Sequence, residues 1–278
     1  MAPGRHITAV ITAGVLWAVV GLAGAMRPAV ELSPRVPELG GAHAPSFVRF
    51  VGSEEEAGSF GAVNSCQPCH DNAVSEWQSS AHAWASFSNP WYRFAVDRFR
   101  SDVGHLESNF CGGCHDPVLV ARGEMAGTVT PELDGAHLGV PCAGCHGVIE
   151  TTPQGNASLA IDLTAPVLPI EGDDASLLAH REQVAPDVLR SDALCISCHR
   201  GFLGPDTGNV HHLIGMDDAS DWARSPFAGT GIERLDLGVE RQGCVDCHMR
   251  GADGKVTHRF AGSHTLLSAA LGDEAQLQ

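Results

Sequence analysis

The chain has 278 residues, which is enough for one or two ordinary domains. It holds 33 acidic and 17 basic residues, so its formal net charge at pH 7 is −16 with neutral histidines. This charge argues against nucleic acid as a partner and favours a protein partner with a basic docking patch. An acidic surface that only keeps the protein soluble is the alternative interpretation.

The first 26 residues have the composition of a targeting or membrane segment. Arg5 precedes an uncharged run from Ile7 to Met26 that ends with Ala23-Gly24-Ala25, a pattern typical of a signal-peptide cleavage site. The run is about twenty residues long, which also suffices to cross a bilayer uncleaved. We expect residues 1–26 to be a signal peptide or a membrane anchor. Either outcome places the rest of the chain in the periplasm or elsewhere outside the cytoplasm, anchored to the inner membrane if the segment is retained.

Residues 27–61 are rich in proline and glycine and show no sustained helical or strand period. We expect them to form a linker or a wrapping arm. The remaining residues, 62–278, are expected to form one functional domain, because they hold every cysteine of the chain.

The pattern C-x-x-C-H occurs five times in residues 62–278. It is the signature of c-type haem attachment. Because residues i, i+3 and i+4 share one face of a helix, both thiols can form thioethers to a porphyrin while the histidine points at the iron. The five motifs consist of Cys66, Cys69 and His70; Cys111, Cys114 and His115; Cys142, Cys145 and His146; Cys195, Cys198 and His199; and Cys244, Cys247 and His248.

Zinc sites, redox dithiols and disulfide frameworks also use paired cysteines. None of them requires a histidine directly after every pair, and no cysteine is left over in this chain. The sequence therefore predicts five covalently bound c-type haems, each with its iron. Since porphyrins would supply much of the buried apolar surface, such a chain does not need a large aliphatic core.

Two helices are expected after the first motif. Apolar residues at helical spacing, among them Trp77 and Trp84, predict a helix over residues 73–86. Asn89 is expected to cap a second, short helix that begins with Pro90. The chain around the second and third motifs is rich in glycine, and we expect it to be irregular.

Two further helical pieces are expected before the fourth motif. Asp173 or Asp174 can cap a helix that carries His180 and stops near Pro186, and a second piece covers residues 187–199. The predicted fold class is mainly α with long loops: short helices wrapped around five covalent haems, with little sheet.

Histidines outside the motifs are the candidate distal ligands, because five six-coordinate irons need five more ligands. The set that fills this number is His82, His180, one of His211 and His212, His258 and His264. Since His258 and His264 flank Gly262, each can reach a different iron. His43, His105 and His137 remain as alternatives.

The first four motifs and their flanks carry a family resemblance. The matching pieces are CQPCH followed by EWQSSAHA, then CGGCH, then GVPCAGCHG, then CISCH. Together they resemble the multihaem cytochrome c family that includes the tetrahaem electron acceptor of hydroxylamine oxidoreductase. The fifth motif is an addition to that pattern.

The resemblance also implies ligand roles. By analogy, His82 would be the distal ligand of the haem on His146, and His180 would serve the haem on His199. The family member leaves its second haem five-coordinate, which in this chain would be the haem on His115.

Two functions fit these motifs. The first is electron transfer in an exported respiratory or redox chain, because two histidine ligands stabilise both iron states and leave no position for a substrate. The alternative is a multihaem oxidoreductase that acts on a small nitrogen or sulfur compound at one open haem. No motif has lysine in place of histidine, as pentahaem nitrite reductases do, and only Tyr92 could cross-link a haem as in hydroxylamine oxidoreductase. We therefore favour an electron carrier, with redox proteins as its partners.

Overall fold

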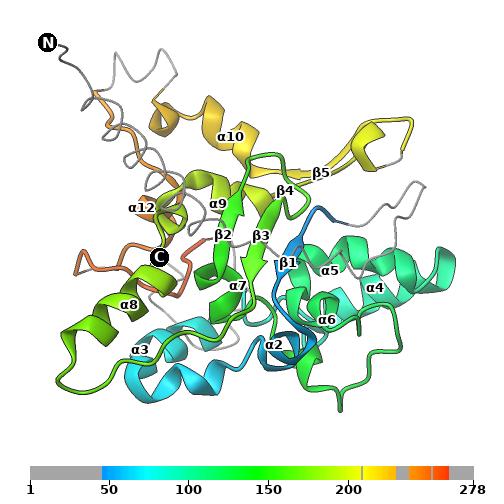
Figure 1. Cartoon of the computed structure of the whole chain (residues 1–278). Helices are drawn as coiled ribbons and strands as arrows, with labels where there is room; N and C mark the ends of the chain where they lie inside the picture. Colours follow the sequence, from blue (N-terminus) through cyan, green and yellow to red (C-terminus); the bar gives the residue numbers. More distant parts are fainter. Residues whose placement is uncertain (1–45, 208, 230–237, 252, 263–278) are drawn as a thin grey trace, which may run out of the picture. The chain divides into compact units, whose positions relative to one another are not determined.

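Short helices joined by long loops make up most of the structure, together with two small sheets. The computed structural model describes residues 46–207, 209–229, 238–251 and 253–262. All of them belong to one compact unit, Leu32–Gln278. Figure 1 shows the course of the chain through these elements.

The helices carry all five motifs. The α-helices in the described residues are α2 (Glu54–Ser59), α3 (Gln67–Gln78), α4 (Pro90–Asp102), α5 (Asn109–His115), α6 (Pro117–Ala121), α7 (Cys142–His146), α8 (Asp174–Val184), α9 (Asp192–Cys198), α10 (Asp218–Arg224) and α12 (Cys244–His248). The 3-10 helices are η1 (Val63–Ser65), η2 (Leu106–Ser108), η3 (Asp134–His137), η4 (Asp187–Arg190), η5 (Pro205–Thr207) and η6 (Pro226–Ala228).

The strands form two separate small sheets. In the first, β3 (Leu159–Asp162) lies between β1 (Arg49–Val51), to which it is parallel, and β2 (Val148–Thr151), to which it is antiparallel. In the second, β4 (Arg200–Leu203) pairs antiparallel with β5 (Leu213–Asp217). The predicted fold class, mainly α with little sheet, is confirmed.

The aliphatic core lies around α5, α6 and the three-stranded sheet. Val118, Leu119, Met125 and Val148 are completely buried there, and Ile161 is nearly so. By contrast, none of the residues of α8, α10 and α12 is buried. This contrast fits a chain in which porphyrins supply part of the buried surface.

The first predicted helix ends earlier than expected. Helix α3 stops at Gln78, because Ser79 takes the C-cap position, and the following residues form turns instead of continuing towards Ser86. Trp77 is buried as predicted, but Trp84 is 37% exposed and donates its indole N–H to the Gln78 carbonyl. The apolar spacing therefore continued past the end of the helix.

The described part of the predicted linker or arm is folded. Residues 46–61 contain β1 and α2, and Val48, Ala57 and Phe60 are buried in the core. Ser53 caps α2 in a reciprocal capping box, which is a local signal of a helix start.

The other helix starts follow their capping residues. Asn89 caps α4 and Asp173 caps α8, as predicted. The helical piece expected over 187–199 is divided into η4 and α9, because Ser191 is extended and caps α9.

No helix within the described ranges is both long enough and apolar enough to cross a membrane. The run from Ile7 to Met26, with the signal peptide or anchor predicted for it, lies outside the described residues.

We expect Leu119→Ala to lower the free energy of unfolding by about 2–5 kcal/mol, because it leaves a cavity in the buried core. Thermal and denaturant unfolding of the haem-loaded protein would measure this loss. Leu178→Ala is the matched control, since Leu178 is 55% exposed and its truncation should change stability by less than about 0.5 kcal/mol. Equal losses in the two variants would contradict this placement of the core.

Candidate functional site

Each C-x-x-C-H motif lies on a helix. The first motif opens α3, which kinks at His70 and continues to Gln78; the second and fourth motifs end α5 and α9, and the third and fifth form all of α7 and α12. In the first motif Cys66 is the N-cap residue, and in the fourth motif His199 is the C-cap residue. None of the ten cysteines forms a disulfide. The helical geometry predicted from the spacing is therefore present.

Four of the five motif histidines donate their Nδ1–H to a fixed acceptor. These hydrogen bonds run from His115 to Ala85 O (2.9 Å), from His146 to Val184 O (2.5 Å), from His199 to Asp218 Oδ2 (3.0 Å) and from His248 to Ala261 O (2.5 Å). A neutral imidazole carries one ring proton, so a proton held at Nδ1 leaves the Nε2 lone pair free for a metal ion. The four histidines are thus oriented as iron ligands.

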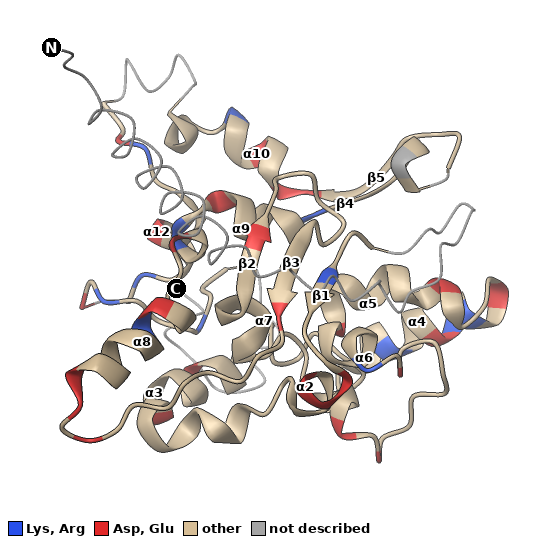
Figure 2. Ribbon diagram, viewed as in Figure 1, with Lys and Arg blue, Asp and Glu red and all other residues tan. Residues whose placement is uncertain are grey.

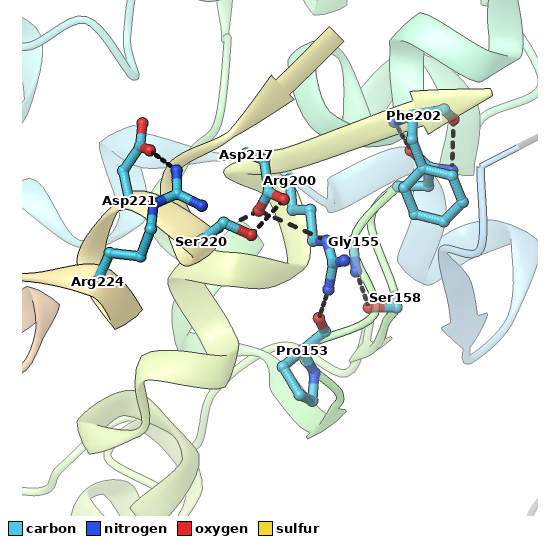
Figure 3. Close-up of polar contacts among 10 residues, drawn as sticks. Pro153, Gly155, Ser158, Arg200, Phe202, Asp217, Ser220, Asp221 and Arg224 are labelled. Carbon is cyan, nitrogen blue, oxygen red and sulfur yellow. Dashed lines mark hydrogen bonds and ion pairs between the residues drawn. The ribbon is translucent and has the colours of Figure 1, made fainter. Parts of the chain in front are cut away.

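The acceptor of His199 is itself held by the chain that follows the fourth motif. Asp218 begins α10, and its neighbour Asp217 caps that helix and accepts a hydrogen bond from the Ser220 hydroxyl. Arg200 Nε lies 3.6 Å from Asp217 Oδ1, and Figure 3 shows these two side chains pointing toward each other. These contacts hold the start of α10, from which Asp218 reaches His199.

Three motif histidines each face a second histidine from a distant part of the chain. The ring centres and planes are 6.2 Å and 12° apart for His70 and His180, 6.2 Å and 27° for His146 and His258, and 6.1 Å and 80° for His199 and His82. Two imidazoles that bind one metal ion from opposite sides, each through a nitrogen about 2.0 Å away, have ring centres about 6 Å apart. Each pair therefore fits one haem iron.

The distal histidines of two pairs are also held by hydrogen bonds, one through its ring and one through its backbone. His180 donates Nδ1–H to Val167 O at 2.7 Å. The backbone N–H of His258 donates to Glu76 Oε2 on α3 at 2.8 Å, so the helix of the first motif holds the ligand that faces the third. Burial lowers the pKa of His258, which favours the neutral ring that a metal ligand needs.

The structure replaces the pairing that the family resemblance implied. His82 faces His199 and not His146, because His146 is faced by His258. The backbone explains the difference. Val140 N–H, two residues before the third motif, donates to the His82 carbonyl at 2.9 Å, while the ring of His82 turns to the fourth motif. His82 is thus close to the third motif along its backbone only.

His180 also has a different partner from the one implied. It faces His70 of the first motif, because α8 and the preceding chain bring its ring opposite α3. The resemblance had assigned His180 to the haem on His199, whose facing histidine is His82.

Within the described residues, the histidine of the second motif contacts a tyrosine ring instead of a second histidine. The ring of Tyr92 stacks on His115 with centres 4.5 Å and planes 20° apart, which is too close for a metal ion between them. The hydroxyls of Tyr92 and Ser86 donate to the buried carboxylate of Asp116. Burial raises the pKa of Asp116 to about 6 and, together with the Asp116 charge, raises the pKa of Tyr92. Sequence reasoning missed this network, although an aspartate between a motif histidine and Pro117 was a visible signal.

No histidine in the described ranges faces His115 or His248 at the separation of the three pairs. His211 and His212 are exposed, and His212 lies against the ring of Phe202. Two of the alternatives are exposed and bond to nearby carbonyls: His105 to Gly127 and His137 to Pro131. The predicted ligand His264 and the alternative His43 lie outside the described residues.

We expect His82→Ala to open the iron position opposite His199 and to leave the His146 position closed, because His258 still faces His146. Electron paramagnetic resonance (EPR) of the oxidised, haem-loaded variant would show one low-spin signal converted to a high-spin signal. His105→Ala is the control, since His105 is exposed and its ring bonds to Gly127 O. Loss of the signal from the His146 site in His82→Ala would favour the pairing that the resemblance implied.

Comparison with known proteins supports the identity of these motifs. Residues 65–147, which include the first three motifs, match the family described as cytochrome c554 and c-prime. A penta-haem cytochrome c552 from Thermochromatium tepidum is structurally similar with a TM-score of 0.48 and 18% sequence identity, over 72% of this chain and 57% of that one. This chain thus matches less than two thirds of that structure. No curated protein matches the sequence. The motifs and the family match together support a multihaem cytochrome c that binds c-type haem covalently and transfers electrons.

Proposed function

We propose that the protein is an exported electron carrier with five covalent haems, one on each motif. The observation that carries the proposal is the set of three histidine pairs, each with the separation that one iron requires. When bound, each haem supplies a one-electron couple between Fe³⁺ and Fe²⁺. At three sites the paired histidines would hold the iron between them, and a haem held in this way would exchange electrons without binding a substrate.

The hydrogen bonds at Nδ1 support the same role. They hold the rings at His115, His146, His199 and His248 in one orientation, which limits how much the ligands move when the charge of the site changes. A fixed ligand geometry in both oxidation states favours fast transfer of single electrons.

The partner we propose is a redox protein with a basic docking patch. The chain is strongly acidic, and Figure 2 shows Asp and Glu on α2, α8 and α10. Helix α8 carries a distal histidine, His180, and also Asp174 and Glu182, so acidic residues lie on an element of one proposed electron-transfer site. By the motif resemblance, a donor of the hydroxylamine oxidoreductase type is one candidate.

The proposal also includes a location outside the cytoplasm. It is supported by the signal-like composition of residues 1–26 and by the covalent haem attachment that the five motifs predict. Retention of the uncharged run would anchor the protein to the inner membrane.

A second candidate function rests on the second motif. Since Tyr92 stacks on His115 and no described histidine faces that ring, the iron on His115 would keep one axial position open. A multihaem oxidoreductase that acts on a small nitrogen or sulfur compound would use this position. Added nitric oxide would then bind at the His115 site.

The intact mass of the purified protein should equal the polypeptide plus five haems. The double variant Cys66→Ser and Cys69→Ser should lose one haem, because both thioether positions of the first motif are gone. Ser65→Ala, next to the motif, is the control and should keep the full mass. A native protein with four haems or fewer would contradict the proposal.

Electron exchange with a basic redox protein should slow as the salt concentration rises, because screening weakens attraction between opposite charges. Stopped-flow absorption at increasing ionic strength would measure the rate. A small uncharged reductant is the control, and its rate should stay nearly constant. A rate with the basic protein that is equally insensitive to salt would contradict the proposed partner.

A further inference from the structure

Residues of different motifs lie close together in three places. Cys66 and Cys142 pack against the same apolar cluster, Cys114 Sγ lies 4.0 Å from Cys198 O, and Cys244 contacts the helix that carries Cys195. Each thiol is the attachment point of its own porphyrin, so these contacts give the neighbours of each motif. The first motif lies beside the third, the second beside the fourth, and the fourth beside the fifth.

One carboxylate joins the fourth and fifth motifs. Asp192 is the first residue of α9, the helix of the fourth motif, and its Oδ1 accepts the backbone N–H of Cys244 at 2.7 Å. Its other oxygen forms an ion pair with Arg241. Only 14% of the Asp192 side chain is exposed, and a side chain at Gly243 would collide with Oδ1. The start of α12 is therefore fitted closely around this carboxylate.

Two residues just before α12, Arg241 and Gln242, contact Trp222 of α10. The guanidinium of Arg241 lies 5.2 Å from the ring centre of Trp222, and the Trp222 indole N–H donates to Gln242 O at 3.0 Å. No residue of α12 itself is buried, so hydrogen bonds and the ion pair, rather than apolar packing, fix its position.

We infer that the fifth haem site extends the array at the fourth site, and that Asp192 is the residue that positions it. The inference rests on the proposed function, because it requires a haem on each motif. Electrons that reach the fifth site would then pass through the fourth. Each transfer moves one electron, so one iron is oxidised as its neighbour is reduced, and no bond forms or breaks.

EPR of the oxidised, haem-loaded protein can show which haem sites are neighbours. The ligand planes of His82 and His199 are nearly perpendicular, whereas those of the other two pairs are closer to parallel. The angle between the ligand planes sets the anisotropy of a low-spin signal, so the fourth site is distinguishable from the first and third.

Cys244→Ala with Cys247→Ala removes the attachment at the fifth motif. We expect the signal of the fourth site to change, because it loses a paramagnetic neighbour, while the near-parallel signals stay the same. The matched control is Cys66→Ala with Cys69→Ala, which should alter the signal of the third site and not that of the fourth. A change confined to the near-parallel signals on removal of the fifth attachment would overturn the inferred order.

The role of Asp192 has its own test. Asp192→Ala removes both acceptors, so we expect it to change the fourth-site signal while the mass still shows five haems. Asp192→Asn keeps an acceptor for Cys244 N–H and should restore the signal, and Asp187→Ala, an exposed position on η4, should have no effect. Loss of one haem in Asp192→Ala but not in Asp192→Asn would support the same role.

Different results would contradict the role of Asp192 and the proposed five-haem function. An unchanged fourth-site signal in fully loaded Asp192→Ala would overturn the positioning role of Asp192 alone. A native mass below five haems would contradict the proposed function itself.

Discussion

The structure depends on imidazole rings from distant segments facing each other across a space for one iron. His70 meets His180, His146 meets His258 and His199 meets His82, and each pair joins residues that are far apart in the sequence. Metal binding that brings such ligands together contributes its free energy directly to folding. This explains how a helix such as α8, which buries no residue of its own but carries His180, keeps a defined position.

Because histidine pairs hold part of the chain, aliphatic packing is needed mainly in one region of the molecule. Aliphatic packing is concentrated around α5, α6 and the three-stranded sheet, where Val118 and Leu119 are completely inaccessible to solvent. Elsewhere short hydrogen bonds do the positioning, from imidazole Nδ1 to backbone carbonyls and from the Cys244 backbone N–H to Asp192. A chain built in this manner leaves much of its surface free for charge, which suits contact with the basic redox partner that we propose.

Local signals in the sequence predicted local structure well. The motif spacing predicted a turn of helix at each motif, and Asn89 and Asp173 marked helix starts, because capping depends only on neighbouring residues. The end of α3 was missed, since apolar spacing continues to Trp84 although the helix stops at Gln78. The fold of residues 46–61 was missed as well, because strand β1 exists only through its pairing with β3.

The sequence predicted which histidines are candidate ligands, but not which motif each of them faces. His82, His180 and His258 were recognised as candidate ligands from their positions in the sequence. Which motif each one faces depends on tertiary contacts, such as the bond from His258 to Glu76 and the one from Val140 to the His82 carbonyl. No spacing rule contains that information, and the family resemblance assigned His82 and His180 to other motifs.

The most direct measurement is EPR of the unmodified, oxidised and fully haem-loaded protein, recorded with and without cyanide. Three low-spin signals that cyanide leaves unchanged are the result that the histidine pairs require. A response confined to the His115 or His248 sites would agree with the account and would point to an open iron. Conversion of the signals from the His70, His146 or His199 sites to cyanide complexes would contradict it.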